Sequence, residues 1–299
     1  MKKSKSFIRL LIVTAACGAS NAFAPQQSVF ALSKPTSTTS PSSLNVWNPF
    51  LKKDEGPSVV QVVKQEPVPG PLDNANYIAG AVWLVLITWA FGFAPGELGS
   101  VADNEMITLL VTQPTPRPEG INELWFAVWN CFAVVPLLLG ALEAPVGRGQ
   151  RLPAAPFLFG SGAFGYFSLG PYFATRTVRT EPVDLDDLGW ASRNIFESRI
   201  FGVFMSAIAI SIPFTSDLLG CDLSSTISGY IDLASSSRFV AVASIDITIM
   251  SLIAAVLVSQ DATRRGWDDK ATPLLAASIL LPVVTPCLYL AARPSLEEE

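Results

Sequence analysis

Six long apolar windows are the feature that most limits what this chain can fold into. Each holds close to the roughly 20 residues that an α-helix needs to cross a hydrocarbon core of about 30 Å. Backbone groups in lipid must be satisfied within the segment, so we expect helices and not strands. The windows are 77–94, 124–142, 156–174, 200–219, 239–258 and 274–292. The sequence therefore predicts an all-α, polytopic transmembrane helix bundle of about six spans within residues 71–294.

The composition agrees with a membrane protein. Of the 299 residues, 50% are apolar and 15% are charged, and the mean hydropathy is +0.41. Soluble domains average about 25% charged residues. The net charge is −5 and there is no basic stripe, which argues against nucleic acid as a partner. We expect the lipid bilayer as the main partner.

The third window is the least secure of the six. It contains four glycines and an internal Pro171. Its small residues would let a neighbouring backbone approach closely; they are Gly160, Ser161, Gly162, Ala163 and Gly165. Prolines also predict kinks in the second, fourth and sixth windows; they are Pro136, Pro213, Pro282 and Pro286.

Residues 1–22 have the three parts of a signal peptide. Lys2, Lys3, Lys5 and Arg9 precede a short apolar run that ends at Ala16. Ser20 and Ala22 then provide the small residues at −3 and −1 of a cleavage site. The alternative, a first membrane anchor, is disfavoured because the apolar run is much shorter than a span.

Residues 23–70 are predicted to be a transit peptide and a disordered lead-in. The segment 23–53 is basic, rich in Ser, Thr and Pro, and free of acids, as plastid transit peptides are. The junction SNAFAP resembles the ASAFAP motif of diatom-type bipartite plastid presequences. The resemblance implies a plastid membrane, thylakoid or inner envelope. Residues 295–299 form an acidic tail.

No residue pattern names a reaction or a cofactor. The chain has no His, and Cys131, Cys221 and Cys287 are too scattered for a metal cluster. We therefore predict no metal site and no catalytic residues, and the sequence disfavours an enzyme while leaving pigment or lipid binding open. We also find no clear internal repeat of the transporter type.

Asp246 is the one ionisable residue deep inside a window. Intramembrane carboxylates are costly and usually face the bundle interior, so they are functional candidates. Counting along the helices places Ser211 and Thr285 at a similar depth, as candidate partners in a ligand or relay site. The alternative is a structural acid that is hydrogen-bonded between helices.

A second group of charged residues flanks the later windows. Glu197 and Arg199 precede the fourth window, and Asp261, Arg264 and Arg265 follow the fifth. We expect Glu197 to pair with Arg264 or Arg265 as an inter-helix clamp at the interface. A headgroup or anionic-substrate site is the alternative. With six spans, the loops 95–123, 175–199 and 259–273 would share one side of the membrane, and their Arg residues favour the stroma.

Residues 122–176, 196–204, 246–267 and 282–294 resemble an uncharacterised family of multi-spanning membrane proteins from cyanobacteria and plastids. The segments that carry the resemblance include LGPYFATR, FESRIFGVF and PVVTPCLYLAARP. The resemblance implies a membrane of the photosynthetic lineage and no chemistry. It also suggests that a shared pattern includes Glu143, Glu197, Arg199, Asp246 and the 261–265 segment.

The sequence leaves two classes of function open. The first is a structural or assembly factor associated with photosynthetic membrane complexes. It is favoured by the small-residue packing faces and by the lack of catalytic motifs. The second is a small-solute or proton-coupled transporter that uses Asp246.

Overall fold

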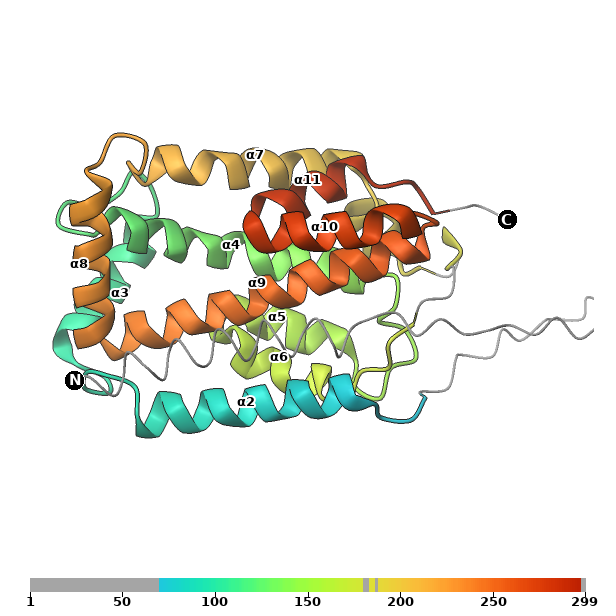
Figure 1. The fold of residues 1–299 in the computed structure, drawn as a ribbon, viewed down its shortest axis with the longest axis horizontal. Helices are drawn as coiled ribbons and strands as arrows, with labels where there is room; N and C mark the ends of the chain where they lie inside the picture. The colour runs from blue at the N-terminus through green and yellow to red at the C-terminus, as the bar shows by residue number, and fades with distance from the viewer. Residues whose placement is uncertain (1–69, 180–182, 186–187, 297–299) are drawn as a thin grey trace, which may run out of the picture. The chain divides into compact units, whose positions relative to one another are not determined.

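The computed structural model describes residues 70–296, apart from 180–182 and 186–187, and in these residues it shows helices and no strands. The predicted signal peptide and transit peptide lie outside the described residues. Figure 1 shows that the helices α2, α4, α7 and α9 run along the bundle. Their bounds are Asn74–Gly92, Glu123–Glu143, Arg199–Thr215 and Arg238–Arg264. The all-α prediction is confirmed.

Side chains just before these helices fix where they begin. Asp73 forms a capping box with Asn76 at the start of α2. Asn122 and Ser237 accept hydrogen bonds from the backbone N–H groups of Trp125 and Val240 in the first turns of α4 and α9. Each cap satisfies an amide that the helix itself leaves without a partner.

Three of these helices, α2, α4 and α9, are long and apolar enough to cross a membrane. The fourth, α7, is apolar and 17 residues long. At 1.5 Å per residue α7 measures about 26 Å, which is near the lower limit for a span.

The windows 156–174 and 274–292 are not continuous helices. The first is broken into α5 (Ala154–Phe164) and α6 (Tyr166–Phe173), and the second into α10 (Asp268–Leu280) and α11 (Val284–Ala292). The breaks lie at Gly165 and at 281–283, where Pro282 stands. Among the described residues, four of the six windows are single helices, so the six-span count is not confirmed.

Each broken window folds back on itself as a hairpin. In the first, the Ser168 hydroxyl donates to the Phe157 carbonyl, 11 residues earlier. In the second, the Thr285 hydroxyl donates to the Ala277 carbonyl. The two ends of the first hairpin also meet, because the Gln150 amide bonds to the backbone of Thr177. Each hairpin therefore enters and leaves at the same end of the bundle.

Because the hairpins fold back, the prediction that loops 95–123, 175–199 and 259–273 share one side also needs a correction. Loop 95–123 lies at the end of the bundle that also holds α8 (Leu223–Ser236), because Asn122 donates to the Thr226 carbonyl. The described residues of loop 175–199 and the segment 259–273 lie at the opposite end, where Arg265 contacts Glu197. The two hairpins return the chain to the end from which it entered, so the three loops do not share one side.

The described part of the chain consists of two halves with the same order of elements. A long helix leads to a short helix, then to a second long helix and then to a helical hairpin. The short helices are α3 (Val101–Thr112) and α8, and Figure 1 shows α8 lying across one end of the bundle. The halves are α2 to α6 and α7 to α11, the second preceded by the π-helical turn Ser192–Phe196.

A polar motif repeats in the two halves. In the first, Tyr172 and Arg176 contact Glu143 at the end of α4, with O···O and N···O distances of 2.8 and 3.0 Å. In the second, Tyr289 and Arg293 contact Asp261 near the end of α9, at 2.9 and 3.0 Å. The segments are YFATR (172–176) and YLAAR (289–293). The described residues therefore contain an internal structural repeat, although the sequence shows no clear repeat of the transporter type.

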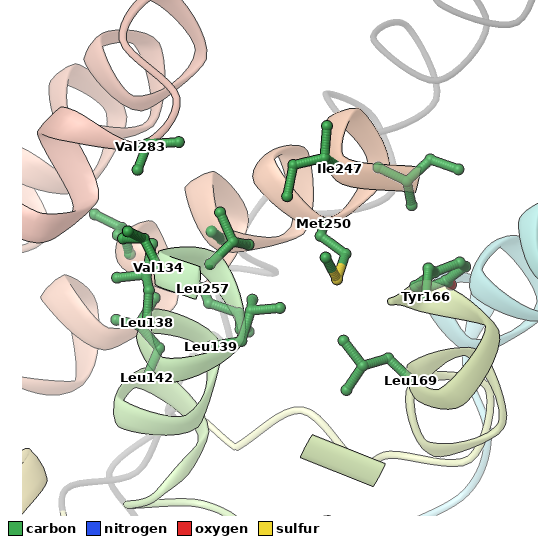
Figure 2. Packing of buried hydrophobic residues seen from close by; sticks show 14 of the residues in the cluster. Val134, Leu138, Leu139, Leu142, Tyr166, Leu169, Ile247, Met250, Leu257 and Val283 are labelled. Carbon is green, nitrogen blue, oxygen red and sulfur yellow. The ribbon is translucent and has the colours of Figure 1, made fainter. Parts of the chain in front are cut away.

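The core lies where the two halves meet. Figure 2 shows side chains of α4, α6 and α9 facing the same interior space, with Leu139, Leu169 and Met250 among them. These side chains are at most 1% exposed, and their burial excludes water from the middle of the bundle.

Candidate functional site

Asp246 lies in α9 beside the tip of the α5–α6 hairpin. The backbone N–H of Tyr166 donates to its Oδ1 atom, with an N···O distance of 2.7 Å. The side chain is buried, with 4% of the residue exposed. The carboxylate thus caps α6, whose first amide has no partner within the helix, and the positive end of the helix dipole favours the negative charge.

Gly165 is required at this tip for two reasons. Its φ angle is +54°, in the region that disfavours side chains. A Cβ atom at this position would also overlap Oδ2 of Asp246. Gly165, in the small-residue face of the third window, therefore leaves space for the Asp246 carboxylate of α9.

The second helix of the hairpin is held against α2. The Trp83 indole N–H donates to the Phe167 carbonyl, and the Tyr166 hydroxyl donates to the Ala79 carbonyl, both at 3.0 Å. At the base of the hairpin, the Asn76 side chain donates to two backbone carbonyls near the end of α6. These bonds fix the position of the tip relative to Asp246.

A cavity of about 940 Å³ reaches from α3 to this tip. Its walls come from α2, α3, α4, α9 and the hairpin, and most of the lining side chains are apolar. Asp246 and Gly165 both line it. The exposed side chains of Phe91, Leu98 and Phe164 are also in its wall, so the cavity is partly open to the outside of the bundle.

Two other charged side chains line the cavity, and both have several partners. Arg238 donates to three backbone carbonyls at the end of α2 and in the loop that follows it, those of residues 91, 94 and 96. Asp103 accepts from the Ser237 hydroxyl and the Phe239 backbone N–H. These two residues join the ends of helices to one another.

The structure does not join Ser211 or Thr285 to Asp246. The Ser211 hydroxyl donates to the Ile208 carbonyl in its own helix, and Thr285 bonds within the second hairpin. Counting residues gives the depth of a side chain but not its direction, and these two point elsewhere. The partner of Asp246 is a backbone amide, which no side-chain pattern could have revealed.

The charged residues at the other end of the bundle form one buried network. Arg265 contacts both carboxylate oxygens of Glu197, at 2.8 and 2.9 Å, as well as Asp261. Arg264 pairs with Asp261 at 2.7 Å. Arg293, which was not predicted to belong here, bridges Glu197 and Asp261. The signal that could have identified it is the repeated Y-x-A-x-R pattern.

Arg199 does not belong to this network. It is the first residue of α7, and its side chain is exposed. Glu143, which the family resemblance includes in the shared pattern, instead lies in the equivalent network of the first half, with Tyr172 and Arg176. The Arg176 side chain also donates to the Gln260 side chain of α9, so the first network contacts the second half of the chain.

No group of three His, Cys, Asp or Glu side chains that could hold a metal ion occurs within the described ranges. The arrangement at Asp246 can accept a proton or pair with a cation. Comparisons with protein-family models, with curated proteins and with solved structures found no match, so the family resemblance stays a prediction.

Proposed function

We propose that the chain is an integral plastid-membrane protein that moves a small solute, with Asp246 as the binding or relay group. One observation carries this proposal: the helix break at Gly165 brings the start of α6, capped by the buried carboxylate of Asp246, to the wall of a large cavity. The plastid location rests on the presequence of residues 1–70.

A broken helix inside a membrane protein is costly unless protein or a cavity surrounds the break. Transporters place such breaks at their binding sites, where helix ends and unwound backbone contact the solute. Many transporters are also built from two repeats, and parallel repeats lie about an axis along the membrane normal. The two halves of this chain, which run in the same direction, match that architecture.

For the membrane topology we propose four crossings and two hairpins that enter from one side. The crossings are α2, α4, α7 and α9. The bases of the hairpins then lie on the same face as Gly70 and Pro294, near the two ends of the described chain. The backbone carbonyls of Gly70 and Pro294 accept hydrogen bonds from Arg151 and Arg265, respectively. The short helices α3 and α8 lie on the opposite face.

A structural or assembly role in photosynthetic complexes is the second candidate. It is favoured by the capping bond to Tyr166, which gives Asp246 a structural task already. The outward surface of α7 is also apolar, since Ile200 is 81% exposed and Phe214 is 64% exposed. Lipid or a partner protein would cover this surface.

The substitution Asp246→Asn separates the two candidates, because Asn keeps an oxygen for the Tyr166 amide but removes the charge. We expect normal accumulation of the protein and loss of flux in proteoliposomes. The assay measures uptake from a panel of labelled cationic, neutral and anionic solutes, together with proton movement from an entrapped dye. Asp232→Asn, on the exposed face of α8, is the matched control.

Intact wild-type protein that moves neither protons nor any solute of the panel would overturn the transport proposal. Co-purification with photosystem subunits, together with their loss when the protein is absent, would then support the second candidate.

A further inference from the structure

We infer that the cavity takes a lipophilic amine, an apolar molecule whose protonated nitrogen pairs with Asp246. This inference rests on the proposed function and gives its substrate class. It follows from the walls of the cavity, from the charges that line it and from the Oδ2 atom of Asp246, to which no described residue donates a hydrogen bond.

The walls fit an apolar body. Ligand sites usually enclose about 300–1,000 Å³ and are mostly apolar with a few polar groups, and this cavity of about 940 Å³ lies in that range. Aromatic rings come from five different helices; they are Phe91, Trp129, Phe132, Phe164, Phe167 and Phe239. The faces of such rings attract cations.

The charges in the wall favour a cation over an anion. The guanidinium of Arg238 is already engaged by three backbone carbonyls. Both oxygens of Asp103 accept bonds that cap the start of α9. Asp246 is therefore the charged group left to meet a ligand, and an anion would face a like charge there.

Asp246 retains the capacity for such a contact. Its Oδ1 atom accepts from Tyr166, and no residue that the structure describes donates a hydrogen bond to Oδ2. An ionised carboxylate has about four acceptor sites, and burying it without a partner is costly. The end of α6 offsets part of this cost, and a ligand ammonium would offset more of it.

The test uses the full chain in detergent and two probes of one carbon skeleton. The first is a naphthylalkylamine that is protonated at pH 7, and the second is the corresponding alcohol. Equilibrium dialysis measures both affinities. We expect the amine to bind wild-type protein more tightly than the alcohol. We expect Asp246→Asn to weaken amine binding about 10- to 100-fold, because a charge-assisted hydrogen bond is lost.

Two further variants control for folding. Asp232→Asn removes an exposed carboxylate outside the cavity and should leave both affinities unchanged. Ala133→Trp fills the cavity from an exposed position on α4 and should abolish binding of both probes. If the Asp246→Asn variant does not fold, the ratio of amine to alcohol affinity in the wild-type protein is sufficient to test the inference.

Equal affinities for amine and alcohol would overturn the inference, as would full amine binding by Asp246→Asn. The failure of the transport proposal would look different. Amine binding without any flux would support the site and overturn transport. Flux of another solute without amine binding would support transport and overturn this substrate class.

Discussion

At the scale of single residues, Gly165 and Asp246 together determine the hairpin tip. The carboxylate occupies the space where any larger residue would carry its Cβ atom, and it satisfies the amide that follows the break. Asp246 stands out in the sequence as the ionisable residue deep inside an apolar window, but Gly165 does not stand out by hydropathy. Their contact allows α9 to support a helix break that lipid would not tolerate.

We predict that Gly165→Ala lowers the stability of the protein by about 1–3 kcal/mol, because the positive φ angle is strained and the new methyl group displaces Asp246. Thermal unfolding in detergent measures the change. Gly162→Ala is the control, since its added Cβ meets open space. Equal melting temperatures for the two variants would contradict the packing that we describe.

At the scale of elements, each hairpin is tied at its base to the long helix that precedes it. The tyrosine and arginine at the ends of α6 and α11 contact an acid at the end of α4 and α9. The glycines Gly170 and Gly202 allow the close approach of α2 to α6 and of α7 to α11, since an added Cβ atom would overlap the Trp83 ring or the backbone of Ala291. The same contacts thus form in both halves.

Tyr172→Phe and Tyr289→Phe should therefore have similar effects. Each removes a buried hydrogen bond to a carboxylate, which contributes about 1.5–3 kcal/mol to stability. Chemical or thermal unfolding of the purified protein checks this expectation. Tyr77→Phe, at a 66% exposed position in α2, should change little. A large effect in only one half would mean that the two motifs are not equivalent.

At the scale of the whole molecule, the two halves place the short helices α3 and α8 at one end and both hairpin bases at the other. Polar contacts cross between the halves at the first end. Asp103 of α3 bonds to Ser237 before α9, and Thr226 of α8 bonds to Glu123 of α4. Each short helix therefore supports the start of a long helix in the opposite half.

This arrangement predicts which exposed sites share a side of the membrane. Single cysteines at the exposed positions Glu119, Ser224 and Asp268 would be introduced into a cysteine-free chain and labelled in sealed vesicles with an impermeant maleimide. We expect Glu119→Cys and Ser224→Cys to react from the same side and Asp268→Cys from the other. A topology with six spans pairs Glu119 with Asp268, so that labelling result would contradict four crossings.

The helices themselves could be predicted, and the breaks within them could not. Hydropathy identifies the 156–174 window. The residues on both sides of Gly165 are equally apolar, so the mean hydropathy of the window does not indicate the turn at Gly165. The glycines and Pro171 marked the segment as the least secure. The repeat could not be predicted because the two halves share only a short Y-x-A-x-R pattern. The tyrosines of that pattern contact acids about 30 residues earlier in the sequence, and only the structure shows those contacts.

The sequence by itself determined that the described chain is helical and largely apolar, because lipid-compatible composition and helix caps are local properties. It also indicated that Glu197 would pair with Arg264 or Arg265, since charges that flank apolar windows gather at the ends of a bundle, and the structure shows that Arg265 is the partner. Only the tertiary structure decided which windows fold back, which amide meets Asp246 and that the two halves match. Those features depend on contacts between segments that are far apart in the sequence. The direction in which a side chain points decides which group it contacts there, and the sequence gives only its depth along the helix.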